Sequence, residues 1–195
     1  MAGQLGRPRE FNEDAVLTDI MSVFWRNGYE GTGLAQIIKA TGLQKGSLYK
    51  AFENKQDMYV KALAHYEKNI VDKAVKSLIS GSPPPFERVK AFLSTPVKAP
   101  FNESDRRGCF LCNASADFAA HDDETRALVA RGYGKLERGL KAAIEQIHPD
   151  WTPYKLETSA QLCLSVYAGL RNMSRAALEK NRLEGARDAC LERLI

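Results

Sequence analysis

Residues 41–52 read TGLQKGSLYKAF, in which two lysines, a serine, a tyrosine and a glutamine surround a few apolar positions. Leu48, Ala51 and Phe52 fall on one side of a short helix that begins at Gln44 or Lys45. Helical spacing places the polar side chains on the opposite face. This outward set consists of Gln44, Lys45, Gly46, Ser47, Tyr49 and Lys50. The stretch therefore predicts a helix with one apolar and one basic face.

A second short helix precedes it over residues 34–41, with Ile37 and Ile38 facing inward. We expect Thr32 to cap its N-terminus and Gly42 to end it. Two short helices joined by a tight glycine-containing turn form a helix-turn-helix. Lysine neutralises phosphate, and glutamine or lysine can read base edges in the major groove. The pair predicts a DNA-binding unit, and the alternative is a solvated basic face on an ordinary helical bundle.

Outward from this pair, the pattern of the chain is helical. Residues 13–27 carry apolar side chains at helical spacing, with Asn12 as N-cap and Gly28 at the end. A long helix follows the cap Asn54 and closes near residue 80. Further helices are predicted over about 85–95, 107–119, 123–147, 153–180 and 182–195, separated by prolines that include Pro96. Because no stretch alternates apolar and polar residues as a strand does, the fold class is all-α.

The composition is that of an ordinary globular protein. The 195 residues are 44% hydrophobic and 27% charged, enough for a small domain joined to a larger one. No apolar run approaches the roughly 20 residues that cross a bilayer, and the first residues lack a secretory signal, so we expect a cytoplasmic protein. Residues 1–60 hold equal numbers of basic and acidic side chains. The basic character of residues 41–52 is therefore local and does not extend to the whole domain.

Two segments carry a resemblance to a known family. GRPREF and FWRNGYEGTGLAQIIKATGLQKGSLYKAFENKQDMY, with their spacing, resemble the N-terminal domain of the TetR family of transcriptional repressors over roughly residues 7–63. The resemblance implies a DNA-binding domain over residues 1–54 and a ligand-binding and dimerisation domain over residues 55–195. It further implies a homodimer that binds double-stranded operator DNA with a palindromic sequence and leaves it when a small molecule binds.

The same resemblance suggests roles for single residues. The base-proximal start of the recognition helix corresponds to Gln44, Lys45, Gly46 and Ser47. Tyr49 and Lys55 match usual phosphate contacts, Lys50 could add a contact, and Thr32 matches the polar cap of the preceding helix. Gly33 stands where relatives often have serine or threonine, so one phosphate contact is in doubt. Arg7 and Arg9 resemble an arm that reaches the minor groove, with a disordered tail as the alternative.

The C-terminal half resembles the family more loosely. The last two helices are expected to form the dimer interface as half of a four-helix bundle, with packing inside one subunit as the alternative. The predicted interface residues are Leu156, Cys163, Tyr167, Leu170, Leu183 and Leu194. An effector pocket is expected among the helices between the two ends. Its predicted lining includes Tyr66, Phe92, Cys109, Phe110, Cys112 and Phe118, together with Phe86, Phe101 and Tyr133.

Cys109 and Cys112 leave several interpretations open. Burial as small apolar groups is one. A thiol sensor of oxidants or electrophiles is another, because Arg106 and Arg107 could lower a thiol pKa at a helix start. A zinc site would need two further ligands, and none is evident. An enzyme, a thiol oxidoreductase built on this pair, is disfavoured because such chemistry usually has a βαβ setting. We therefore expect no enzyme, no catalytic residue, no cofactor and no bound metal.

Overall fold

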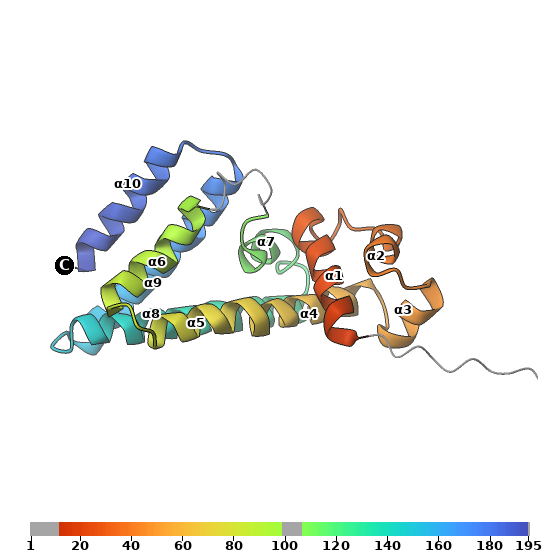
Figure 1. Ribbon diagram of the computed structural model, residues 1–195, viewed down its shortest axis with the longest axis horizontal. Coiled ribbons are helices and arrows are strands. Elements are labelled where there is room, and N and C mark those ends of the chain that lie inside the picture. The colour runs from red at the N-terminus through yellow and green to blue at the C-terminus, as the bar shows by residue number, and fades with distance from the viewer. Residues whose placement is uncertain (1–11, 99–106, 195) are drawn as a thin grey trace, which may run out of the picture.

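The computed structural model describes residues 12–98 and 107–194. Arg7, Arg9, Phe101 and Arg106, for which the sequence suggests roles, lie outside these ranges. Over the described ranges the chain forms helices and connecting loops without a strand, which confirms the all-α fold class. The first helices of the chain gather at one end, and the larger helical part extends from them (Figure 1). No helix in these ranges is both long and apolar enough to cross a membrane.

The helices at that end are α1 (Glu13–Asn27), α2 (Leu34–Thr41) and α3 (Lys45–Ala51). Local caps set their bounds. Asn12 Oδ1 accepts a hydrogen bond from the Ala15 backbone N–H at 3.2 Å, and Gly28 ends α1 with a φ of 73°. Gly42 ends α2 in the left-handed conformation, with a φ of 67°, which glycine adopts readily. These bounds confirm the predicted helix-turn-helix.

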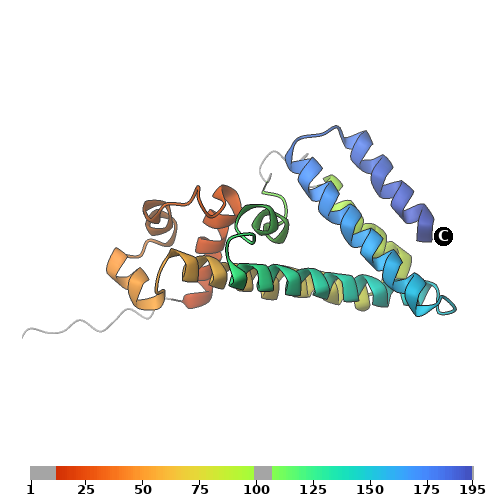
Figure 2. The same cartoon turned by 180° about the vertical axis from the view of Figure 1, so that it is seen from behind.

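One long helical rod joins the two parts of the molecule. It consists of α4 (Lys55–Tyr66), a π-helical turn (Glu67–Val71) and α5 (Asp72–Ile79). Asn54 caps it, because its Oδ1 accepts a hydrogen bond from the Asp57 N–H at 2.9 Å. The predicted long helix is therefore confirmed at both ends, with a π turn in its middle. The helix α8 (Asp123–Ile147) runs beside this rod (Figures 1 and 2).

The helix α6 (Pro85–Lys98) continues through Pro96, so the predicted break at this proline is wrong. A proline lacks the backbone N–H that would bond the carbonyl four residues earlier. That carbonyl belongs to Phe92, and Thr95 Oγ1 donates a hydrogen bond to it at 2.8 Å instead. The substitute hydrogen bond satisfies the carbonyl and lets the helix run on.

The remaining helices are α7 (Phe110–Asp117), α9 (Pro153–Arg175) and α10 (Lys180–Leu191), followed by a 3-10 turn (Glu192–Leu194). The helix α9 packs on α8 and α6, and α10 folds back against both α9 and α6 (Figure 2). The helix α7 lies between this group and α1 (Figure 1). A continuous hydrophobic core runs from α1 through α4 and α7 to α8 and α9. The two ends of the molecule are thus joined by packed side chains as well as by the rod.

Candidate DNA-binding surface, domain junction and effector cavity

The outward face of α3 projects away from the core. Its inner side is anchored by Leu48, which is fully buried. Tyr49 is 45% exposed on the outer side. Among the described residues, no atom lies within 4 Å of the position that a Cβ would take on Gly46, so a partner can approach the helix closely there. The outer residues are Gln44, Lys45, Gly46, Tyr49 and Lys50, with Ser47 half-buried beside them.

Thr32 does not cap α2, so that prediction is wrong. Gly33 is the N-cap, and its backbone N–H donates a hydrogen bond to Gln36 Oε1 at 2.7 Å. Thr32 is 1% exposed, and its Oγ1 donates to the Gly28 carbonyl at 2.7 Å. The turn after α1 directs this hydroxyl back into the protein, and Thr32 is therefore not accessible to DNA.

Lys55 stands at the first turn of α4, where the sequence places a phosphate contact. It is half-buried, and its Nζ lies 4.4 Å from the centroid of the Tyr29 ring. Tyr29 in turn stacks on Phe118, with the ring centroids 3.8 Å apart. A cation over an aromatic face is held by the ring quadrupole. Lys55 is consequently less free than Lys45 or Lys50, which are both exposed.

The junction between the two parts of the molecule is formed by α7 and the residues before it. Asp117 Oδ2 accepts a hydrogen bond from the Tyr29 backbone N–H at 2.7 Å, just past the end of α1. Asn113 Nδ2 donates to the Trp25 carbonyl at 3.4 Å, and the Arg107 guanidinium lies 4.2 Å from the centroid of the Trp25 ring. These contacts tie α7 to the last turn of α1, so a displacement of either helix strains the other.

Most of the predicted effector-pocket residues pack within this junction. Phe110 is 1% exposed and contacts Tyr59 and Tyr66 edge to face, with centroid distances of 5.6 and 5.7 Å. Tyr66 is also buried, and Phe118 stacks on Tyr29. Together with Trp25 these rings form a closed aromatic cluster. This arrangement supports a packing role for Phe110 and Tyr66.

Cys109 and Cys112 lie against the same cluster and are 2% and 3% exposed. Hydrogen bonds from Cys112 and from the Tyr66 hydroxyl, whose oxygen is 3.4 Å from Cys109 Sγ, lower the pKa of Cys109. Pairing with Cys109 and burial raise the pKa of Cys112. Reaction with an oxidant or electrophile requires access as well as a thiolate. The burial of both sulfurs therefore favours packing over thiol sensing.

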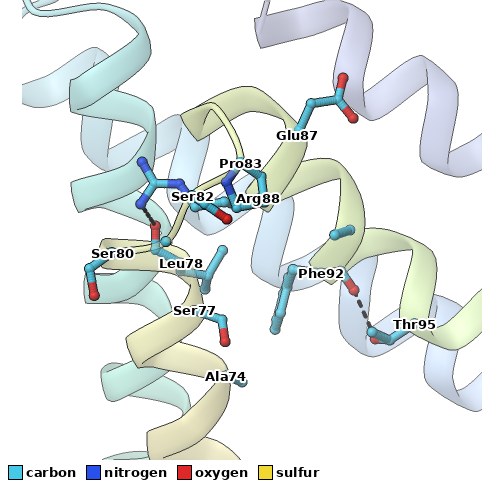
Figure 3. A pocket seen from close by; sticks show the side chains of 12 residues that line it. Ala74, Ser77, Leu78, Ser80, Ser82, Pro83, Glu87, Arg88, Phe92 and Thr95 are labelled. Carbon is cyan, nitrogen blue, oxygen red and sulfur yellow. Dashed lines mark hydrogen bonds between the residues drawn. The ribbon is translucent and has the colours of Figure 1, made fainter.

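A cavity of about 460 Å³ opens between α5 and α6, beneath the loop that joins them (Figure 3). This volume lies within the range of small-molecule sites. Phe92, one of the predicted effector-binding residues, points into it (Figure 3). Leu78 and Ala74 from α5 add apolar surface, and Arg88 from α6 lines it from the loop side. The cavity therefore combines apolar walls with a cation.

The predicted dimer-interface residues are buried inside the subunit, which corrects their assignment. All six, namely Leu156, Cys163, Tyr167, Leu170, Leu183 and Leu194, are 5% exposed or less. They face α6, α8 and the neighbouring turns of α9 and α10. These residues therefore belong to the hydrophobic core of the larger helical part.

The opposite face of α9 is exposed and carries apolar residues that the sequence analysis missed. Tyr154 is 79% exposed, Leu162 42% and Met173 47%. Gly169 lies between them along the same face, and no described atom is within 4 Å of the position of its missing Cβ. Large apolar side chains aligned on one exposed helix face indicate an interaction surface. In the sequence of α9 these residues form a second apolar repeat, out of phase with the stronger repeat, and this pattern could have indicated the exposed apolar face.

Comparisons with known proteins agree with this geometry. Residues 16–62 match the family model described as bacterial regulatory proteins, tetR family. The transcriptional repressor ComR of Escherichia coli K12 is 30% identical over 136 residues, which cover 70% of this chain and 65% of ComR. The regulator YezE of Bacillus subtilis 168 is 27% identical over 146 residues, which cover 73% of this chain and 75% of YezE. The chain belongs to the TetR family.

The TetR fold extends over the larger helical part as well. A solved structure of the TetR family regulator CifR, a cysteine mutant in complex with 26-base-pair operator DNA, is 27% identical and superposes with a TM-score of 0.80. The superposition covers 95% of this chain and 98% of the CifR chain. Nearly the whole chain thus has the fold of a TetR regulator that has been solved with operator DNA, whereas its match to ComR spans just under two thirds of that protein.

Proposed function

We propose that this TetR-family protein is a cytoplasmic, non-enzymatic repressor that binds palindromic operator DNA as a homodimer and leaves it when a small molecule binds. The observation that carries the proposal is the outward face of α3. Its lysines, glutamine and tyrosine project from a helix-turn-helix whose inner side is held by Leu48. A surface of this kind supplies both phosphate contacts and base readout.

The contacts divide by position on α3 and α4. Gln44 and Lys45 at the start of α3 read base edges, with Gly46 allowing close approach. Tyr49 and Lys50 reach phosphates, as does Lys55 from the start of α4. Ser47 is half-buried and contributes at the edge of this surface. The sequence-independent contacts should dominate affinity, and Lys45 should dominate sequence preference.

Binding to an operator fragment and to random DNA of equal length tests these roles. We expect Lys45→Ala to weaken operator binding by about tenfold and to reduce the preference for operator over random DNA. Lys55→Ala should weaken binding to both DNAs and lower the salt slope by about one unit. Lys76→Ala, which removes an exposed charge from α5, is the matched control. Equal losses on both DNAs for Lys45→Ala would contradict the assignment of base reading to α3.

The exposed apolar face of α9 supports homodimerisation. Tyr154, Leu162 and Met173 form a stripe on that face, and Gly169 leaves room for another helix to approach closely. A second copy of the chain would bury this stripe against its own. Two helix-turn-helix units held in this way bind two half-sites about 34–36 Å apart. Because the second unit then binds intramolecularly, the dimer binds the operator far more tightly than a single unit does.

Leu162→Glu tests this interface because it places a charge in the middle of the stripe. We expect a monomer in sedimentation at micromolar concentration and a loss of operator affinity of roughly a hundredfold or more. Ala130→Glu adds the same charge at an exposed position of α8 and should leave the dimer intact. A wild-type protein that sediments as a monomer would refute the dimer.

The arrangement of the rod suggests how a ligand would release DNA. The cavity lies against α5, and α5 continues through the π turn into α4, which packs on α1. Asp117 and Asn113 of α7 also hold α1. A ligand that separates α5 from α6 would therefore shift the rod and the helix-turn-helix attached to it.

A further inference from the structure

Arg88 is a buried cation that has no carboxylate partner among the described residues. It is 8% exposed, and its Nη1 donates a hydrogen bond to the Leu78 carbonyl at 2.8 Å while Nη2 donates to Gln146 Oε1. Both acceptors are neutral. No acidic side chain of the described residues forms an ion pair with Arg88, and its Nε has no hydrogen-bond partner. Buried charges are normally paired, so this guanidinium is unusual.

The cavity beside Arg88 has the shape of a site for an amphipathic molecule. Phe92 and Leu78 form apolar walls, and Ser77 adds a hydroxyl group at the edge (Figure 3). The acidic lining residue, Glu87, directs its carboxylate away from Phe92 and Leu78 (Figure 3). The charge that Arg88 brings to the cavity is therefore not offset by Glu87.

A second cation, the half-buried Arg171, lies behind the far wall of the cavity. Thr95 lines the cavity, and its Oγ1 accepts a hydrogen bond from Arg171 Nη2 at 3.0 Å. Arg171 also donates to the Tyr167 hydroxyl at 3.0 Å, and Tyr167 stacks on Phe92 with centroids 4.3 Å apart. Arg171 has no carboxylate partner among the described residues either. Both ends of the cavity thus favour negative charge.

We propose that this cavity binds a small amphipathic carboxylate, with the carboxylate directed toward the Arg88 guanidinium and the apolar part against Phe92 and Leu78. A carboxylate would supply the missing negative charge as well as a hydrogen-bond acceptor. A neutral ligand would supply at most the acceptor. As the effector of a repressor, such a ligand rests on the proposed function, but its binding can be measured without DNA.

Calorimetric titration of the full-length protein with octanoate and with octanamide, its neutral isostere, tests the proposal. We expect octanoate to bind about tenfold or more tightly than octanamide, since a charge-assisted hydrogen bond is worth more than a neutral one. Arg88→Gln should lower the octanoate affinity to that of octanamide and change the octanamide affinity by less than about twofold. Lys90→Gln removes an exposed charge from the same helix and should preserve the preference.

A second variant tests whether octanoate binds in this cavity, and its result does not depend on whether Arg88→Gln folds. Ala91 is exposed and lines the cavity, so Ala91→Trp should fill it and abolish binding of both probes. The proposal is overturned if wild-type protein binds the two probes equally or binds neither. It is also overturned if Ala91→Trp still prefers octanoate, because the anion would then bind elsewhere.

Operator binding measured on the same samples separates this proposal from the proposed function. Selective octanoate binding in a protein that ignores operator DNA would support the cavity and refute the repressor. Tight operator binding without octanoate selectivity would support the repressor and refute the proposed carboxylate site. If both stand, octanoate should also weaken operator binding by the wild-type protein, and this effect should disappear in Ala91→Trp.

Discussion

Glu67 and Arg88 are both buried charged residues, but among the described residues only Glu67 has oppositely charged partners. Glu67, in the π turn, is 3% exposed and receives Arg131 at 2.5 Å and Lys135 at 2.9 Å, both from α8. Arg88, on α6, is 8% exposed and has only neutral acceptors among the described residues. A charge with internal partners fastens two helices together. A charge without them remains available to a ligand.

The recognition helix α3 carries a third kind of charged residue, one that is exposed to solvent. Lys45 and Lys50 are exposed to solvent and face away from the core. Such cations exchange small counterions for phosphates, so their binding is sensitive to salt. A buried cation such as Arg88 is screened far less. Exposure therefore distinguishes the partner of each group: a polyanion for α3, a single small anion for Arg88, and the protein itself for Glu67.

The largest expected effect follows from this difference in exposure. Operator affinity should fall roughly 10³- to 10⁵-fold between about 50 and 200 mM salt if the dimer makes six to ten phosphate contacts. Octanoate affinity should change less than about threefold over the same range, because Arg88 is shielded from counterions. Fluorescence anisotropy for DNA and calorimetry for octanoate provide the two slopes. Equal salt dependence of the two affinities would mean that Arg88 is as accessible to counterions as the lysines of α3, and would contradict the distinction drawn between them.

The paired charge should matter most for stability. Hydrogen bonding from Arg131, reinforced by Lys135, holds the pKa of Glu67 below its ordinary value of 4.5 despite its burial. A depressed pKa contributes stability above the ordinary value and loses it as the pH falls through the folded value. Glu67→Gln should therefore cost about 2 kcal/mol at neutral pH, a figure reduced because the Arg131 side chain is half exposed.

Urea unfolding at neutral pH and near pH 3, at one protomer concentration, measures this cost. The difference between wild-type protein and Glu67→Gln should shrink as the pH falls through the lowered pKa of Glu67, because the wild-type carboxyl then becomes protonated. Glu145→Gln, at an exposed position of α8, should show no significant cost at either pH. A cost for Glu67→Gln that persists unchanged at low pH would assign it to packing and not to charge.

The N-terminal end was predictable because its helix ends depend on neighbouring residues. Asn12, Asn54 and Gly42 act through contacts within a few residues, so their sequence alone carries the information. Thr32 was an exception, since its hydroxyl bonds backward to Gly28 and not forward into α2. Short-range capping rules do not decide whether a hydroxyl accepts a hydrogen bond from the helix that follows or donates one to a carbonyl that precedes it.

The larger helical part was predictable as helices but not as surfaces. Helix α9 carries two apolar stripes, and periodicity does not reveal which one meets the core. The stronger stripe, which includes Leu156 and Cys163, packs inside the subunit, and Leu162 lies on the weaker one. Arg88 left a detectable signal, because an arginine falls within the inward-facing repeat of Val89 and Phe92. The partners of Glu67 lie far along the chain and could not be inferred from spacing.

The smallest expected effect concerns the unpaired charge. Arg88→Met keeps an unbranched apolar stem and removes the hydrogen bonds to Leu78 and Gln146, which should cost about 1–3 kcal/mol. It also removes a buried cation whose desolvation has no compensating ion pair, and this gain is of similar size. We therefore expect the free energy of unfolding to change by less than about 1 kcal/mol in urea.

Arg131→Met is the contrasting variant, because it removes a partially exposed cation that has a partner. It leaves the buried Glu67 with Lys135 alone, so we expect it to cost about 1–2 kcal/mol, more than the loss of the more deeply buried Arg88. If the order were reversed, and Arg88→Met cost more than about 3 kcal/mol, Arg88 would be a structural clamp between α5, α6 and α8. Its charge would then be maintained for stability, and a carboxylate ligand would no longer be needed to explain why a buried guanidinium lacks a counter-ion.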